Sequence, residues 1–147
     1  MREISAFLGR IIEACPAIRS IWLVGERADA SVCEPAASIA WDLVVFADAF
    51  TLHRLRKSTD LHREDVHLRV VTDGDRFDSA WGGLQSSGSL MQWGWRQATP
   101  TEAYYSEAKW ATPLRDGNVE RTRRKAVRLW QSADAPPRRR EAAINIA

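Results

Sequence analysis

Two short stretches of the chain combine residue types that phosphate chemistry uses. Gly25-Glu26-Arg27 follows the apolar run 20-SIWLV-24, and Asp42 lies alone inside the next apolar run, 39-IAWDLVVF-46. A glycine lets the backbone approach a phosphate closely, and a carboxylate can hold Mg²⁺ against phosphate oxygens. The two stretches therefore raise two hypotheses: a working phosphate-transfer site, or the remains of one.

The elements around these residues indicate an α/β fold with a small mixed central sheet flanked by helices. Apolar residues recur at three- and four-residue spacing near the N-terminus, which predicts an amphipathic helix, and three later apolar runs predict buried strands. The predicted order is helix 2–15, strand 20–25, loop 26–38, strand 39–46, a helix within 49–60, and strand 65–72.

The pattern weakens after Asp75. Residues 81–97 mix glycine, serine and tryptophan, which indicates a structured loop or short strands, with Trp93 and Trp95 on one face. Residues 101–111 resemble a helix that Thr101 caps. A last helix is predicted over 118–131, capped by Asn118, because Val119, Ala126, Val127 and Trp130 would share one side.

The first half of the chain, to about Asp75, resembles the nucleotidyltransferase superfamily, which includes kanamycin nucleotidyltransferase and the bacterial-type minimal nucleotidyltransferases. The family signature is a strand ending in Gly-Ser-x-Ala, a loop, and then Ser-Asp-x-Asp before apolar residues. The matching residues are Leu23-Val24-Gly25-Glu26-Arg27-Ala28 and Ile39-Ala40-Trp41-Asp42-Leu43-Val44-Val45-Phe46. The resemblance implies a nucleotidyltransferase-like fold, Asp42 as the catalytic and Mg²⁺-binding carboxylate, and nucleotide-binding positions at Gly25, Glu26, Arg27 and Arg69.

The sequence departs from this signature at three positions. The first carboxylate of the pair is Ala40, the turn serine is Glu26, and the position that aligns with the last family carboxylate is Arg69. One carboxylate cannot offset the charge of two Mg²⁺ ions as three do. The favoured interpretation is a degenerate site in which Asp42 pairs with Arg27 or Arg69.

An alternative keeps the activity. Glu26, Asp42 and either Asp73 or Asp75 could form a rebuilt carboxylate trio, which predicts a Mg²⁺-dependent nucleotidyltransferase. The degenerate site predicts instead a domain that binds a nucleotide or a macromolecular partner and transfers little or nothing.

Two groups of residues in the second half provide other binding hypotheses. The segment from Trp81 to Trp95, with Tyr104, Tyr105 and Trp110, could form core, an oligomer interface or a stacking surface for a base. The basic run could be the solvated face of a helix or a nucleic-acid surface. Its residues are Arg121, Arg123, Arg124, Lys125 and Arg128.

Length and composition set the remaining expectations. A chain of 147 residues with 45% hydrophobic content suits one domain, here 1–131, followed by a Pro- and Arg-containing tail over 132–147. The net charge is +2, and the basic excess lies after residue 100. The N-terminus lacks a secretory apolar run, which predicts a cytoplasmic protein without membrane contact. The aromatic residues and the resemblance to minimal nucleotidyltransferases predict a homodimer or a complex with a partner protein.

Overall fold

The computed structural model describes residues 2–28, 40–82, 87–110 and 119–133. Its helices are α1 (Arg2–Ala14), α2 (Ala49–Lys57) and α3 (Leu90–Trp93), with short 3-10 helices η1 (Glu26–Ala28) and η2 (Thr59–Leu61). Its strands are β1 (Ser20–Val24), β2 (Trp41–Phe46), β3 (Val66–Val71), β4 (Arg76–Trp81), β5 (Ser87–Ser89), β6 (Arg96–Thr99), β7 (Glu102–Trp110) and β8 (Val119–Gln131).

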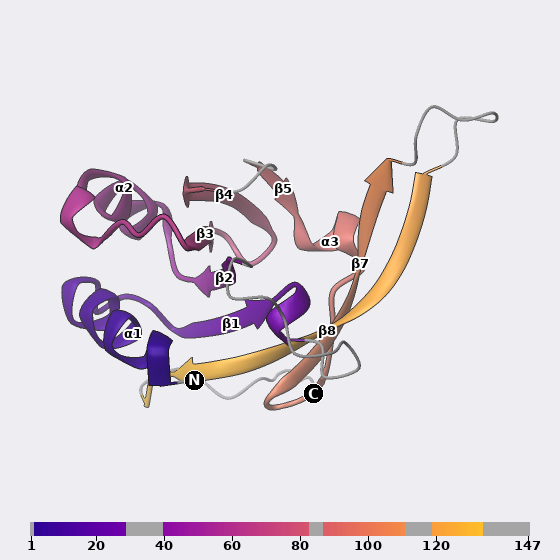
Figure 1. The fold of residues 1–147 in the computed structure, drawn as a ribbon, viewed down its shortest axis with the longest axis horizontal. Coiled ribbons are helices and arrows are strands. Elements are labelled where there is room, and N and C mark those ends of the chain that lie inside the picture. The colour runs from indigo at the N-terminus through magenta and orange to yellow at the C-terminus, as the bar shows by residue number, and fades with distance from the viewer. Residues whose placement is uncertain (1, 29–39, 83–86, 111–118, 134–147) are drawn as a thin grey trace.

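In these described ranges, the eight strands form one curled, half-barrel sheet with the order β5-β4-β3-β2-β1-β8-β7-β6. The neighbours β2 and β3 are parallel, and the other paired strands are antiparallel. The helices α1 and α2 cover one face of the sheet, and α3 lies on the other side near β7 (Figure 1). The expected α/β composition and mixed sheet are confirmed, but the expectation of a small sheet is wrong, because the sheet has eight strands among the described residues.

The predicted helices and strands of the first half are present, whereas the predicted loop over 26–38 begins with η1 and its residues 29–38 lie outside the described part. The α1 stripe buries Ile4, Phe7 and Ile11 against the sheet. The helix α2 begins at Asp48, whose side chain accepts a hydrogen bond from the Thr51 N–H at 2.8 Å. Because β2 and β3 are parallel, α2 is the crossover between them.

The second half contains more strand than predicted. Residues 101–111 and 118–131 were expected to be helices, and this expectation is wrong because β7 and β8 lie there. Their many Glu, Ala, Lys and Arg residues favour a helix locally, but pairing of the two strands buries Ala103, Tyr105 and Ala126 almost completely. Burial outweighs the weak intrinsic preference. Thr101 precedes a strand and caps no helix, and Asn118 lies outside the described residues.

The segment 81–97 holds short strands, as expected, and also one helical turn that was not predicted. This turn is α3, which the Ser89 side chain caps by accepting the Gln92 N–H and which ends at Gly94 in the left-handed conformation. Trp93 and Trp95 therefore do not alternate along a strand, and that prediction is wrong. The preceding strand β4 was also not predicted from the sequence.

A hydrophobic core lies on each face of the sheet. Leu23, Leu43 and Leu68 belong to the core under α1 and α2, whereas Val24 and Val44 belong to the core on the opposite face. Successive residues of a strand point to opposite faces, so a strand buried on both faces needs a continuous apolar run. This need explains the apolar runs of β1 and of residues 43–46 in β2, whereas Asp42, His67 and Arg69 interrupt the apolar pattern of β2 and β3.

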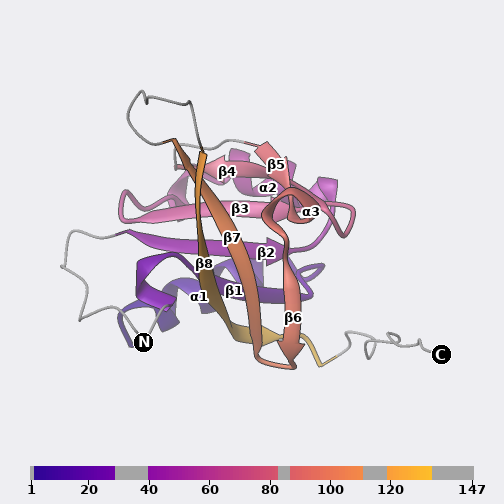
Figure 2. The same ribbon diagram turned by 90° about the vertical axis from the view of Figure 1, so that its right-hand side faces the viewer.

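The strand β8 joins two parts of the sheet. Its last residues, from Val127 to Gln131, pair with β1, whereas its residues from Val119 to Val127 pair with β7. Residues 104–110 of β7 and 119–125 of β8 thus extend beyond β1 as a two-stranded ribbon, which we call the arm. The arm rises away from α1 and α2 (Figure 1) and crosses the direction of β1 to β4 in the orthogonal view (Figure 2).

Candidate functional site

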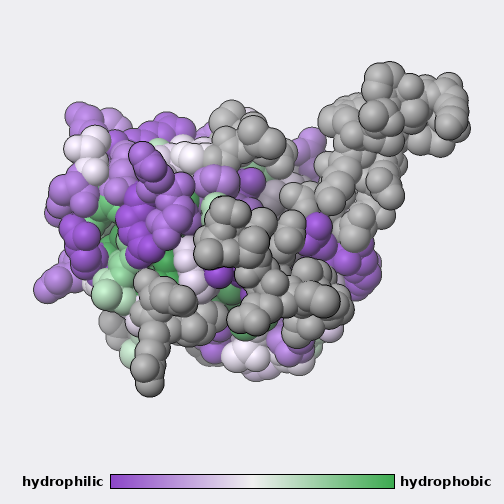
Figure 3. All heavy atoms as spheres, viewed as in Figure 1, coloured by the Kyte–Doolittle hydropathy of each residue, from purple (hydrophilic) through white to green (hydrophobic). Residues whose placement is uncertain are grey.

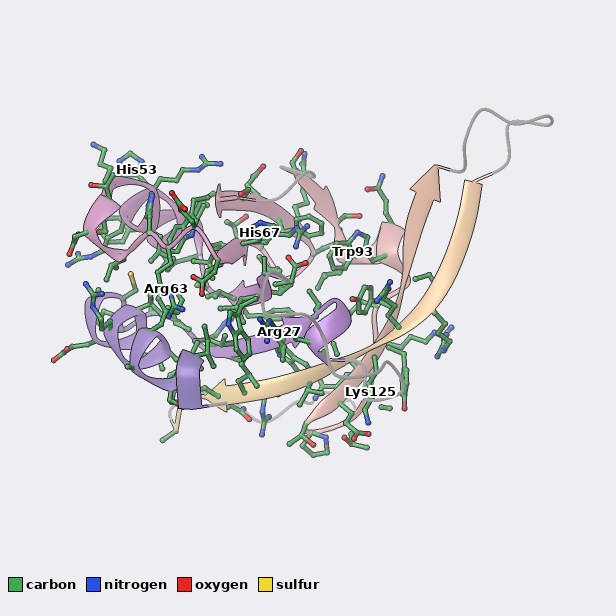
Figure 4. All side chains as sticks on the ribbon, in the orientation of Figure 1. Arg27, His53, Arg63, His67, Trp93 and Lys125 are labelled. Atoms are coloured by element: carbon green, nitrogen blue, oxygen red, sulfur yellow. The ribbon has the colours of Figure 1, made fainter. Side chains whose placement is uncertain are left out.

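Three neighbouring strands bring the predicted site residues together. Gly25 directly follows β1, whose last residue, Val24, is the register partner of Asp42. On the other side of β2, Asp42 is the register partner of His67 in β3, and Arg69 follows two residues later on the same face. Figure 4 shows Arg27, His67 and Trp93 in the middle of the molecule, between the helices and the arm.

Asp42 forms an ion pair with Arg69. The distance from Arg69 Nη1 to Asp42 Oδ1 is 3.0 Å, and the side chains are 10% and 28% exposed. The prediction that Asp42 pairs with Arg27 or Arg69 is confirmed, with Arg69 as the partner. The His67 Nδ1 atom lies 3.8 Å from the same Oδ1, which is too long for a hydrogen bond.

The Arg69 side chain is held against aromatic rings. Its guanidinium carbon lies 5.4 Å from the ring centroid of Trp93 and 5.9 Å from that of Phe77. Its Nε is buried and has no hydrogen-bond partner among the described residues. The favourable electrostatics of Arg69 therefore come from Asp42 and from two ring faces.

Gly25 forms one hydrogen bond and lies close to Asp42. Its N–H donates a hydrogen bond of 2.8 Å to the Tyr105 hydroxyl. Its φ is +79°, and a Cβ added there would lie 3.1 Å from Asp42 Oδ2. The position thus requires glycine both for its backbone conformation and for the close approach to Asp42.

The residues of η1 complete the turn. The Arg27 guanidinium lies over the Trp41 ring, 4.2 Å from the ring centroid. Glu26 belongs to η1, but its side chain is outside the part that the structure describes.

Asp73 and Asp75 lie at the other end of β3 from His67. Asp73 lies six positions after His67, which corresponds to roughly 20 Å along an extended strand. Asp73 Oδ1 accepts the backbone N–H groups of Arg76 and Asp75, and these hydrogen bonds lower the pKa of Asp73. Asp75 Oδ1 accepts the Met91 N–H. Both carboxylates order a turn, and the geometry does not bring them to Asp42.

This geometry does not fit a two-metal magnesium site. Among the described residues, no three His, Cys, Asp or Glu side chains lie close enough to hold one metal ion. The Oδ1 of Asp42 already accepts a hydrogen bond from a buried arginine, which places a positive charge where a cation would have to bind. We therefore derive no step through Mg²⁺.

The aromatic residues of the second half form packing contacts. The Tyr105 ring stacks on Trp93 with a centroid distance of 5.1 Å and lies 6.1 Å from Trp95, which in turn contacts Trp22. Trp81 stacks on His62. Trp93 and Tyr105 are 7% and 1% exposed, so their ring faces are not open for a base. The core interpretation holds for these rings, whereas the Trp110 side chain lies outside the described part.

The basic run is distributed over the two faces of β8. Arg123 is exposed, whereas Arg124, Lys125 and Arg128 are half-buried, and the Arg121 side chain is outside the described part. Figure 4 shows Lys125 on β8, well separated from His53 on α2 and Arg63.

Sequence reasoning missed the role of Tyr105. Its segment was expected to be a separate helix, so nothing connected its hydroxyl to Gly25. The alternation of Ala103 and Tyr105 on one strand face was the available signal.

Comparison with known proteins gives no match to a family model, a curated protein or a solved structure. No helix in the described ranges is both long and apolar enough to cross a membrane.

Proposed function

We propose that this chain is a nucleotidyltransferase-like domain that has lost metal-dependent transfer and acts by binding a macromolecular partner. The observation that carries the proposal is the Asp42–Arg69 ion pair of 3.0 Å. In the family that the first half resembles, both positions belong to the magnesium site. An arginine in place of one carboxylate neutralises the other and removes the charge that would attract a cation.

The same geometry favours a macromolecular partner over a nucleotide. Three positions that the resemblance implies for nucleotide binding already make contacts within the chain. Gly25 N–H bonds the Tyr105 hydroxyl, Arg27 covers Trp41, and Arg69 pairs with Asp42. A nucleotide would have to displace these contacts, and each lost hydrogen bond would reduce its affinity.

Calorimetric titration tests the proposal. The protein is titrated with ATP, GTP, CTP and UTP, with and without Mg²⁺, and each mixture is assayed for nucleotidyl transfer. The variant Asp42→Asn keeps an oxygen acceptor for Arg69, and Asp60→Asn removes an exposed carboxylate on η2 as the matched control. We expect no Mg²⁺-dependent binding and no transfer in any of the three proteins.

Mg²⁺-dependent binding that Asp42→Asn abolishes and Asp60→Asn retains would overturn the proposal. It would favour the active enzyme with a rebuilt site. Binding of a nucleotide without Mg²⁺ and without transfer would agree with the loss of catalysis. It would, however, identify a nucleotide as the ligand in place of a macromolecular partner.

A further inference from the structure

Most of the described part of the arm has no third strand beside it. Within the described residues, β8 has β1 as a neighbour only from Val127 onward, and β7 has β6 as a neighbour only at Glu102 to Tyr104. An isolated two-stranded ribbon is at best marginally stable in water. A ribbon of this kind gains stability when a ligand or partner packs along it.

One face of the arm is polar and basic. The register pairs Arg123 with Ser106 and Lys125 with Tyr104, and directly paired residues lie on the same face. We call these four residues the basic face. On the opposite face, Tyr105 is buried in the core. Hydrophilic atoms are visible at the right of the space-filling view, where the described part of the arm meets grey atoms (Figure 3).

The two charged side chains of the basic face are held by one contact within it and one contact with Glu102 beside it. The Arg123 guanidinium lies over the Tyr104 ring, 5.1 Å from its centroid. Lys125 Nζ lies 3.0 Å from Glu102 Oε2. An arginine that rests on a ring presents its N–H edge in a fixed plane, which suits bidentate binding to phosphate oxygens.

Positive charge is concentrated on these two strands, and Arg123 and Lys125 share one face whereas Arg124 and Arg128 lie on the other. The strand β8 contains five Lys or Arg residues and one Glu, and β7 contains one Lys and two Glu, which gives the pair a net charge of +3. The whole chain has a net charge of only +2.

We propose that the basic face of the arm binds the sugar-phosphate backbone of a nucleic acid. This inference names the partner class for the proposed function and rests on it. A backbone of regularly spaced phosphates matches charges repeated along a strand, and a two-stranded ribbon is narrow enough to enter the major groove of DNA. Contacts to phosphates alone bind without sequence preference.

Fluorescence anisotropy with labelled nucleic acids tests this proposal. The probes are a single-stranded RNA of about 20 nucleotides and a DNA duplex of about 20 base pairs, titrated from about 50 to about 200 mM NaCl. The test variant is Arg123→Gln with Lys125→Gln. The matched control, Arg54→Gln with Lys57→Gln, removes two exposed positive charges from α2, on the far side of the molecule.

We expect the arm variant to bind about tenfold more weakly and its salt slope to fall by about 1 to 2, with the control unchanged. Glu102→Gln should act in the opposite direction, because it removes a negative charge beside Lys125. Circular dichroism checks that both variants are folded, so that a change in affinity in either direction reports the change of charge. The affinities for the RNA probe and the DNA probe show which of the two nucleic acids the arm prefers.

Three results would overturn the inference: no binding by the wild-type chain, equal weakening in the α2 control, or full competition by an acidic polypeptide at matched charge. The last result would identify an acidic protein as the partner. The nucleotide titration above can fail separately from this experiment. If the arm does not bind nucleic acid, the proposal that the chain has lost catalysis still stands. If the chain shows Mg²⁺-dependent transfer, the anisotropy experiment still shows whether the arm binds nucleic acid.

Discussion

Arg69 of β3 reaches across to Asp42 of β2, with 3.0 Å between Nη1 and Oδ1. The pair lies on the sheet face opposite α1 and α2, where Phe77 and Trp93 cover the guanidinium. A carboxylate whose charged partner is almost buried contributes to the stability of the fold, because removal of either group leaves the other charge uncompensated.

Asp42→Ala should therefore lower the free energy of unfolding by about 2 kcal/mol, less than for a fully buried pair because Asp42 is partly exposed. Urea unfolding measures this change. The double variant Asp42→Ala with Arg69→Met should recover part of the loss, since no arginine is then left unpaired. Equal stability of Asp42→Ala and the wild-type chain would show that the ion pair contributes nothing.

Tyr105→Phe should cost about 1 kcal/mol, because it removes the hydroxyl that accepts the Gly25 N–H and keeps the ring that stacks on Trp93. Thermal and urea unfolding measure the change. Tyr104→Phe is the matched control on the same strand, and it should change stability by less. If the two variants lose the same amount, the Gly25 hydrogen bond is not the cause.

Gly25→Ala should destabilise the fold more than Gly94→Ala. Both glycines have positive φ, at +79° and +66°, so both substitutions carry the backbone cost of about 1 kcal/mol or more. Only at Gly25 would the new Cβ meet Asp42 Oδ2 at 3.1 Å, whereas nothing lies within 4 Å at Gly94. The difference in unfolding free energy between the two variants isolates the steric contact, and a difference of zero would mean that Asp42 moves aside freely.

Asp48 should make the stability pH-dependent in acid. Hydrogen bonds from Thr51 lower the pKa of Asp48 below its usual value near 3.8. Because the folded-state pKa is the lower one, ionised Asp48 stabilises the fold above the unfolded-state pKa, and this contribution is lost as the pH falls through the folded-state pKa. Unfolding measured from pH 7 downward should show this loss below about pH 4.

Two substitutions separate capping from charge at this position. Asp48→Ala should cost about 1 kcal/mol at pH 7, because it removes the N-cap of α2. Asp48→Asn should retain most of the cap, and its deficit relative to the wild-type chain should shrink as the pH falls below 4. A deficit that stays constant with pH would exclude Asp48 as the titrating group.

The sequence by itself determined the first half of this protein. Apolar runs such as 20–24 and 41–46 are too continuous to be surface strands, and the spacing of Ile4, Phe7 and Ile11 allows only one buried face. The same local patterns placed Gly25 at the end of one strand and Asp42 inside the next strand along the chain. The pairing of Asp42 with an arginine followed from the residue types, although the sequence left both Arg27 and Arg69 as partners.

Only the tertiary structure decided the second half. The segments that contain Tyr105 and Arg123 locally prefer helix. They become strands because β7 and β8 pair with each other and β8 also pairs with the distant strand β1. Strand pairing depends on such contacts, which a local pattern does not encode. For the same reason the Tyr105–Gly25 hydrogen bond, across 80 residues, and the basic face of the arm were visible only once the sheet was assembled.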